Sequence, residues 1–563
     1  MAPDSTARAR ALIQAGNLVE DEGRLATALE QYENAIRIAP AFAQAHLNRG
    51  NVLFKMGQMA SALAAYETVL TIDPKHAGAH YNIGNAHLRA NLPMAALGAY
   101  DKALAIDSEL VDAHLARANV LDDLGRFDAS LLAYRRVLEL RPDYLEAHSN
   151  MLFSHAYRID FPPERMLADA RRFGALAARD ALRATDWSND RDPDRHLRIG
   201  LISGDLRNHP VGYFVEGILA ALRRNASSTL TLYAYPTLLH GPDAVSERIK
   251  ANCHAWYPTA GFPDAQVVDK IVGDKIDILL DLSGHTVGNR LALFAWKPAP
   301  VQATWLGYWA TTGLVEIDYL IADPRTLTAA QENCFTEQIW RLPETRLCFT
   351  APGDDVLPGP LPALDNGFVT FGCFNTLSKM NDDVVEVWGR ILRALPTSRL
   401  FLKASQLNDP DVREEVEQRF SRHGVTPRRL MLHGPTSRAD YLAAYRKVDI
   451  ALDPFPFPGG TTSAEALWMG VPVLTLSGQR FHSRQGLGIL TNAGLNEWIA
   501  DSADDYVARA VSRATDLEDL AALRSGLRHR VLASPLFDAS RFASHFEAAL
   551  RAMWQRWCRQ RGA

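Results

Sequence analysis

Two glycines followed by two threonines form the motif in this chain that points most directly to ligand chemistry. Gly459, Gly460, Thr461 and Thr462 stand between a stretch that reads as a strand and one that reads as a helix. The free N–H groups at a helix start attract anions, glycine lets a ligand approach the backbone, and hydroxyls add donors. The motif predicts a site for a phosphate oxyanion.

Two charged residues would complete that site. Glu465 lies one turn into the same helix, where it could accept hydrogen bonds from ribose hydroxyls. The end of a helix contributes only about 0.3–1 kcal/mol to anion binding, up to ~2 when partly buried, so a second cation is expected. Lys379, in a polar loop after another predicted strand, is the candidate. The plainer interpretations are a helix cap with Glu465 in a capping box, and a solvated loop lysine.

Earlier in the chain, three predicted strand ends carry glycine, histidine and hydroxyl residues. His209 precedes a proline at a helix entry, and a histidine there could orient or deprotonate an acceptor hydroxyl. His285 and Arg290 follow a second strand end, and residues 305–313 follow a third. Together the three strand ends suggest a sugar pocket, although any one of them alone would be weak evidence for it.

Other chemistries find less support. No GxxxxGK[ST] or GxGxxG pattern is present, which disfavours phosphorylation and hydride transfer. Asp-Pro-Asp occurs at 192–194 and 409–411, but both fall in polar stretches that predict turns. We therefore expect no metal and no other cofactor, with a diphosphate neutralised by the helix start and Lys379.

The elements that must position these residues alternate between strand and helix from about residue 197. The alternation predicts parallel sheets covered by helices. A Pro/Gly-rich stretch at 351–362 separates two such series. We expect two Rossmann-like domains, an acceptor-side one at 191–365 and a nucleotide-sugar one at 366–535, followed by a C-terminal helix at 536–563.

The N-terminal quarter repeats every 34 residues. Small residues recur at Gly16, Gly50 and Gly84, a tyrosine column follows each, and a proline closes most units. This is the tetratricopeptide pattern, in which pairs of helices stack into a superhelix. It predicts four repeats over 1–142, then a degenerate capping repeat and linker helix at 143–190.

Asparagines line up in two columns of these repeats. Asn48 and Asn82 share one column, and Asn51 and Asn85 share another three residues later, so both face one side of their helices. Such amides could line a groove that binds the backbone of an extended peptide. Alternatively they satisfy turns between neighbouring repeats.

Composition sets outer bounds. A formal net charge of −5 offers no basic field for nucleic acid. The five scattered cysteines indicate neither a disulfide framework nor a zinc cluster. No signal peptide or membrane-spanning apolar run is visible, so we expect a cytoplasmic protein without membrane or nucleic-acid partners.

Taken together, these segments resemble the protein O-GlcNAc transferase family, in which tetratricopeptide repeats precede a two-domain glycosyltransferase of the GT-B type. The resemblance is most specific in DLRNHP, GHTVGNR, PAPVQATWLGY, FGCFN with the following SK, and GGTTSAEALWMG. It implies transfer of N-acetylglucosamine from UDP-GlcNAc to Ser or Thr of proteins, with inversion and without metal.

The resemblance also implies roles for single residues. Lys379 would hold the diphosphate, Thr461 and Thr462 would cap it, and His209 matches the family's active-site histidine. Thr436 and Arg438 would border uracil and ribose, Tyr441 would stack on uracil, and Leu306 and Gly307 would lie beside the sugar. Departures include Gly460 and Thr376, where the family has histidine and glutamine.

The sequence is compatible with three alternatives. SGHT, GFVTFGCFN and YRKVDIALDPFP are similar to the plant SPINDLY branch, whose members transfer fucose from GDP-fucose. A transferase acting on a small or lipid-linked glycan is a second alternative. A catalytically inactive repeat scaffold that binds partner proteins is a third.

Overall fold

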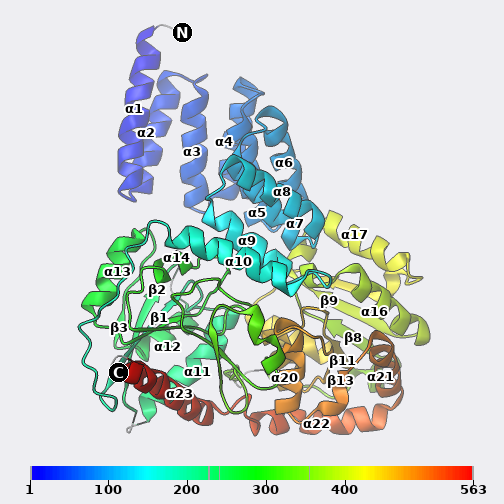
Figure 1. Ribbon diagram of the computed structural model, residues 1–563. Helices are drawn as coiled ribbons and strands as arrows, with labels where there is room; N and C mark the ends of the chain where they lie inside the picture. Colours follow the sequence, from blue (N-terminus) through cyan, green and yellow to red (C-terminus); the bar gives the residue numbers. More distant parts are fainter. Residues whose placement is uncertain (1–2, 226–227, 240, 242, 354–355, 561–563) are drawn as a thin grey trace. The chain divides into compact units, whose positions relative to one another are not determined.

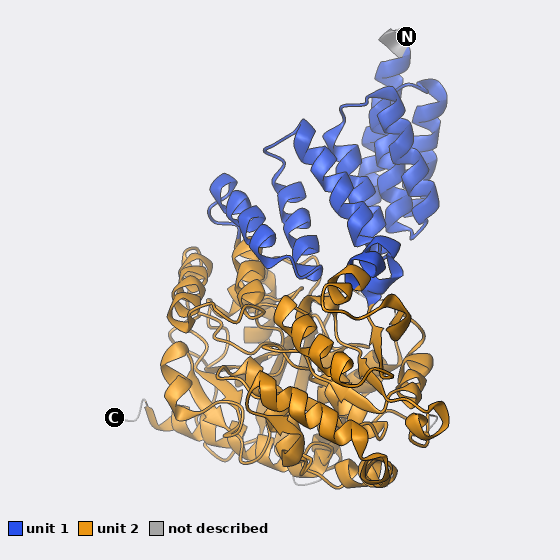
Figure 2. Ribbon diagram, turned by 90° about the vertical axis from the view of Figure 1, so that its right-hand side faces the viewer, with its two compact units in different colours: residues 1–144, 405–416 blue, residues 145–404, 417–563 orange. Residues whose placement is uncertain are grey.

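The computed structural model describes residues 3–225, 228–239, 241, 243–353 and 356–560. The chain forms two compact units, coloured separately in Figure 2. One comprises residues 1–144 with 405–416, and the other comprises residues 145–404 with 417–563.

The repeat unit contains the four predicted helix pairs. They are α1 (Pro3–Asp21), α2 (Leu25–Ile38), α3 (Ala43–Lys55), α4 (Met59–Ile72), α5 (Ala77–Arg89), α6 (Pro93–Ile106), α7 (Val111–Asp123) and α8 (Phe127–Leu140). The tyrosine column is fully buried. The glycine column leaves room for these rings, because a Cβ atom on Gly50 would lie 2.4 Å from the Tyr66 ring.

A segment distant in sequence belongs to the same unit. Residues 405–416 form the short helix η3 (Ser405–Asn408) and most of α17 (Pro410–Ser421). The Asp409 carboxylate accepts a hydrogen bond of 3.0 Å from the Met94 N–H, at the start of α6. Arg126 pairs with Glu415 at 2.7 Å, so this segment is anchored to the third and fourth repeats.

The second unit contains two parallel sheets. The first has the order β3-β2-β1-β4-β5-β6-β7 and the second the order β10-β9-β8-β11-β12-β13. The strands are β1 (Leu197–Ser203), β2 (Leu230–Pro236), β3 (Ala255–Trp256), β4 (Ile278–Asp281), β5 (Val301–Thr304), β6 (Tyr319–Ala322), β7 (Gln338–Arg341), β8 (Thr370–Cys373), β9 (Arg399–Lys403), β10 (Leu430–His433), β11 (Ile450–Leu452), β12 (Val473–Leu476) and β13 (Ile499–Ala500). We call the part that carries β1–β7 the first domain and the part that carries β8–β13 the second domain.

Helices cover both sheets, as Figure 1 shows. The α-helices are α9 (Leu145–His155), α10 (Pro163–Ala178), α11 (Pro210–Arg224), α12 (Ala244–Ala251), α13 (Asp264–Gly273), α14 (Leu291–Phe294), α15 (Pro362–Asn366), α16 (Asp382–Ala394), α18 (Arg438–Ala444), α19 (Thr461–Trp468), α20 (Gln485–Asn492), α21 (Ala503–Thr515), α22 (Leu517–Leu532) and α23 (Ala539–Gln560). The remaining short helices are η1 (Ala329–Cys334), η2 (Leu377–Lys379), η4 (Pro427–Arg429), η5 (Tyr445–Lys447), η6 (His482–Arg484) and η7 (Asn496–Trp498).

The sequence pattern explains these sheets. The inner strands β4, β5 and β8 are buried along their whole length, which in β4 explains the apolar run Ile278–Leu280. The tetratricopeptide array followed by two parallel-sheet α/β domains confirms the predicted fold class. The C-terminal helix α23 packs on α11 of the first domain, and its Phe546 ring lies 4.7 Å from Trp305.

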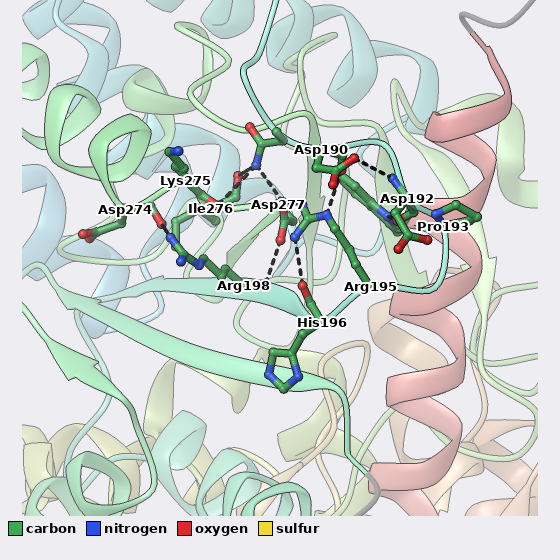
Figure 3. A network of polar contacts seen from close by, with 12 residues as sticks. Asp190, Asp192, Pro193, Arg195, His196, Arg198, Asp274, Lys275, Ile276 and Asp277 are labelled. Carbon is green, nitrogen blue, oxygen red and sulfur yellow. Dashed lines mark hydrogen bonds and ion pairs between the residues drawn. The ribbon is translucent and has the colours of Figure 1, made fainter.

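A polar network fixes the stretch that leads into β1 (Figure 3). The Asp277 carboxylate is fully buried and accepts hydrogen bonds from Asn189 Nδ2, the Arg198 N–H and the Arg195 guanidinium. The backbone of this stretch also binds α23, because Trp554 Nε1 donates to the Asp192 carbonyl at 3.0 Å. The stretch that leads into β1 is therefore held against the first domain.

Candidate nucleotide-sugar site

Helix α19 begins without a side-chain cap. No side chain bonds the helix-start N–H groups, and among the described residues the N–H groups of Gly460, Thr461 and Thr462 have no protein acceptor. The capping-box alternative is wrong, because Glu465 bonds elsewhere. An uncapped helix start leaves several N–H donors aimed at one point, which suits an anion.

Lys379 lies beside this helix start. Its ammonium donates to Asn375 Oδ1 at 3.2 Å and to the Pro458 carbonyl at 3.0 Å, and it sits 4.3 Å from the centre of the Phe457 ring. Thr462 Oγ1 donates to the same Asn375 oxygen at 3.0 Å, which ties the lysine loop to α19. Burial lowers the pKa of Lys379 to about 8. A cation held by neutral oxygens is available to a negatively charged ligand.

Asp453, at the end of β11, anchors the glycine loop. Its Oδ1 accepts hydrogen bonds from the Gly459 N–H at 3.1 Å and from Ser463 Oγ at 2.8 Å. Burial raises its pKa to about 6, and the nearby Lys379 charge opposes that rise. The sequence pattern did not predict this anchoring role of Asp453.

Glu465 is the centre of a second cluster. It is 1% exposed, forms an ion pair with Arg438 at 2.5 Å and accepts a hydrogen bond from Tyr441 Oη at 3.0 Å. Burial raises its pKa, and the Arg438 charge opposes the rise. Since one turn of α19 separates Glu465 from the helix start, a ligand spanning both would carry a hydroxyl-bearing group next to its anion.

Arg438 connects the two domains. Its guanidinium lies 4.6 Å from the centre of the Tyr213 ring and 5.5 Å from that of Tyr441. Tyr213 belongs to α11, whose N-cap residue is His209. Thr436 lies just before Arg438 and is exposed, in the loop between β10 and α18.

His209 caps α11 and faces a buried carboxylate. Its Nδ1 lies 3.4 Å from Val211 N and 3.4 Å from Asp205 Oδ1. Burial raises the pKa of Asp205 to about 6, while the Arg207 charge opposes the rise. Tyr213, one turn further along α11, is the ring that Arg438 covers. His209 therefore stands at the start of the helix through which the first domain contacts Arg438 of the second domain.

Leu306 and Gly307 occupy a strained loop after β5. Leu306 has φ of 75°, a left-handed conformation that is rare for a branched residue and that often marks functional sites. A Cβ atom on Gly307 would lie 2.1 Å from the Leu282 carbonyl oxygen, so this backbone packs directly on the loop after β4. Trp309, two residues on, meets Phe457 edge-on with ring centres 4.7 Å apart.

His285 and Arg290 make contacts that support the first domain. His285 is buried; its Nε2–H donates to the Thr312 carbonyl at 3.0 Å, and its Nδ1 bonds Ser149 Oγ at 2.8 Å. Burial lowers its pKa to about 3, so it is neutral. Arg290 pairs with Asp264 at 2.5 Å. These contacts fix α9 and α13, and the predicted role of both residues in donor binding stays untested.

The asparagine columns form a ladder within the repeats. Asn48 Nδ2 donates to Asn17 Oδ1 at 3.0 Å, and Asn82 Nδ2 donates to Asn51 Oδ1 at 2.9 Å. The buried tyrosines add to it, with Tyr100 Oη donating to Asn85 Oδ1 at 2.7 Å. The ladder joins neighbouring repeats, and peptide binding by these amides stays a prediction.

Among the residues that the structure describes, three or more His, Cys, Asp or Glu side chains nowhere gather so that they could hold a metal ion. Of the helices described there, none is both long and apolar enough to cross a membrane.

Comparison with known proteins decides the family. The model of glycosyl transferase family 41 matches residues 176–351 and 361–546, and tetratricopeptide models match residues 16–57, 50–91 and 111–144. The chain belongs to glycosyl transferase family 41. The resemblance to the O-GlcNAc transferases, with SPINDLY likeness, is thereby confirmed.

Relatives of this family 41 protein include two kinds of plant protein, named SPINDLY and SEC. A probable UDP-N-acetylglucosamine–peptide N-acetylglucosaminyltransferase SPINDLY of Petunia hybrida is 36% identical over 74% of this chain. A similarly named SEC protein of Arabidopsis thaliana is 29% identical over 65% of it. The chain spans less than half the length of these curated relatives, 45% and 38%.

A solved structure resembles the chain along most of its length. It is a lysine-to-methionine mutant of the Thermobaculum terrenum O-GlcNAc transferase, with a TM-score of 0.86 and 35% identity. The match covers 92% of this family 41 chain and 98% of the other.

Proposed function

We propose that the protein transfers N-acetylglucosamine from UDP-GlcNAc to Ser or Thr hydroxyls of proteins, with inversion at the sugar carbon and without a metal ion. The observation that carries the proposal is the uncapped start of α19 beside Lys379, a cation whose hydrogen-bond partners in the described part of the chain are the neutral oxygens of Asn375 and Pro458. Family 41 membership supplies the reaction class.

The reaction needs charge stabilisation at one place. The acceptor oxygen bonds to the sugar's anomeric carbon while the bond from that carbon to the β-phosphate oxygen breaks. The UDP leaves with the electron pair, and attack from the opposite face inverts the carbon. Lys379 and the helix-start N–H groups would stabilise the charge on the leaving diphosphate.

Other residues would bind and orient the two substrates. Glu465, held by Arg438 and Tyr441, would accept hydrogen bonds from the ribose. His209, against Asp205, would orient the acceptor hydroxyl or take its proton. The acceptor protein would bind along the repeats, whose asparagine ladder presents amides at regular intervals.

A second donor is favoured by one observation. The SPINDLY relative is more similar to this chain than the SEC relative, at 36% against 29% identity. Since the resemblance to the SPINDLY branch implies transfer of fucose, GDP-fucose is the alternative donor.

One experiment separates these functions. The protein is incubated with a cell lysate or a Ser/Thr peptide library and either UDP-GlcNAc or GDP-fucose, with and without EDTA, and the products are weighed by mass spectrometry. We expect peptides heavier by one N-acetylhexosamine residue in both EDTA arms. Gain of deoxyhexose from GDP-fucose would instead establish the alternative. No transfer from either donor, and no binding of UDP or GDP, would favour an inactive scaffold.

A further inference from the structure

A glutamine outside the predicted site residues contacts both domains at once. Gln485 begins α20 and is 5% exposed. Its Oε1 lies 2.7 Å from Trp309 Nε1 and 3.0 Å from Arg346 Nη2, both in the first domain. Its Nε2 lies 3.3 Å from the Gly459 carbonyl oxygen, in the glycine loop of the second domain.

The partners fix which way the amide points. The indole N–H of Trp309 and the guanidinium of Arg346 can only donate, so the atom that meets them must be the oxygen. The amide NH₂ therefore faces Gly459, whose carbonyl can only accept. Arg346 is 1% exposed, and its charge lies 4.8 Å from the centre of the Phe481 ring. Its demand for an acceptor holds the glutamine in one orientation.

The Gly459 residue is consequently held at both ends. Its N–H donates to Asp453 Oδ1 at 3.1 Å, and its carbonyl accepts from Gln485. In a trans peptide the carbonyl and the next N–H point in opposite directions. With the Gly459 carbonyl turned to Gln485, the Gly460 N–H must turn away from it, and among the described residues it meets no protein acceptor.

The glycine at 460 fits this arrangement. A Cβ atom there would lie 2.7 Å from Gln485 Nε2, inside the distance of an ordinary contact. A side chain at 460 and the amide of Gln485 therefore compete for one space. The absence of a side chain at 460 lets Gln485 reach the loop.

We propose that Gln485 is a positioning residue that orients the Gly459–Gly460 peptide so that the Gly460 N–H faces the leaving diphosphate. Because Trp309 and Arg346 hold the glutamine from the first domain, the donor pocket is complete only when both domains are in contact. The inference rests on the proposed function. It implies that the packing of the first, acceptor-side domain against Gln485 affects how tightly the diphosphate binds.

The test compares a nucleoside diphosphate with its nucleoside. Wild type, Gln485→Met, Gly460→Ala and the double variant are titrated with UDP and uridine, or with GDP and guanosine if wild type prefers GDP. Gln302→Met is the control, since Gln302 is a buried glutamine whose NH₂ donates to the Phe294 and Glu316 carbonyls of the first domain. Melting temperatures are measured in parallel.

We expect each single variant to weaken diphosphate binding roughly tenfold or more, the change that follows loss of one hydrogen bond to a charged group. Nucleoside binding should change less than about twofold, and the control should keep both affinities. The double variant should lose no more than the worse single variant, because both changes break one contact.

A folded Gln485→Met protein whose diphosphate affinity stays within about twofold of wild type would overturn the inference. If that variant does not fold, Gly460→Ala alone decides by the same criterion. Equal losses for the diphosphate and the nucleoside would also overturn it, because they would indicate a purely structural role. A wild type that binds neither UDP nor GDP would instead refute the proposed function.

Discussion

Replacing Lys379 by methionine should separate binding from stability. Methionine keeps the length of the side chain and its contact with the Phe457 ring but removes the charge. We expect UDP affinity to fall steeply, whereas the protein should still fold, because two opposing effects limit its loss of stability. Most buried polar residues behave differently, because their loss destabilises the protein.

The magnitudes follow from the surroundings of the ammonium. Burial that lowers the pKa of Lys379 from 10.5 to about 8 costs the folded protein roughly 3 kcal/mol as long as the group is charged. Loss of its two hydrogen bonds, to Asn375 and Pro458, costs about 3–6 kcal/mol together, at about 1.5–3 kcal/mol each for a charged donor. The two effects oppose each other, so the free energy of unfolding should fall by no more than about 3 kcal/mol.

The loss of UDP binding energy is not offset by an opposing effect. A unit charge about 4 Å from a phosphate at an effective dielectric of ~20 contributes about 4 kcal/mol. Loss of half to all of this weakens UDP binding roughly 30- to 1,000-fold. Calorimetric titration with UDP measures the affinity, and thermal unfolding measures the stability.

Lys270→Met is the matched control, because Lys270 also lies over an aromatic ring, 5.3 Å from the centre of Tyr257. It belongs to α13 of the first domain and pairs with Asp274. This variant should bind UDP as wild type does. A Lys379→Met protein that binds UDP within about threefold of wild type would refute the placement of the diphosphate.

Three further predictions concern protonation, the carboxylate cluster and the repeats. UDP affinity should fall as the pH rises through about 8, where Lys379 of the unliganded protein loses its proton. Calorimetric titrations with UDP at several pH values should show this fall in wild type and not in Lys379→Met. Because that pKa is depressed, the folded protein without ligand should gain stability between pH 8 and about 10.5, and a loss there would contradict the assignment. Glu465→Gln should lower the free energy of unfolding by about 2–4 kcal/mol in urea titrations, since it removes the buried charge that pairs with the partly exposed Arg438. A stability within 1 kcal/mol of wild type would speak against that pair. Gly84→Ala should destabilise the repeats by about 1–3 kcal/mol, because its Cβ would lie 2.4 Å from a tyrosine ring. In Gly98→Ala the added Cβ atom would meet nothing within 4 Å, so this change should be neutral or stabilising. Thermal unfolding followed by circular dichroism measures the stability of both variants.

Much of this fold is predictable because local patterns decide it. The glycine and tyrosine columns impose the helix pairs, and apolar runs such as 278–281 become inner strands. The two-residue strands β3 and β13 and the edge strand β7 were not predicted, since such short segments carry little periodic signal. The attachment of residues 405–416 to the repeats was also missed, because Asp409 and Glu415 find their partners about 300 residues earlier.

The site divides in the same way. The helix start at Thr461 and the nearby Lys379 could be predicted, since both follow strand ends of one parallel sheet. The capping box was wrong because Arg438 and Tyr441, adjacent only in space, take the Glu465 carboxylate. Gln485 gives no sequence signal at all, because its role depends on Trp309 and Arg346 of the other domain.

A crystal structure of the protein with UDP tests the central claim most directly. The account predicts that the diphosphate oxygens lie within hydrogen-bonding distance of the N–H groups of Gly460, Thr461 and Thr462 and of Lys379 Nζ, with the ribose against Glu465. A nucleotide bound elsewhere, or protein side chains filling the helix start in its presence, would contradict it.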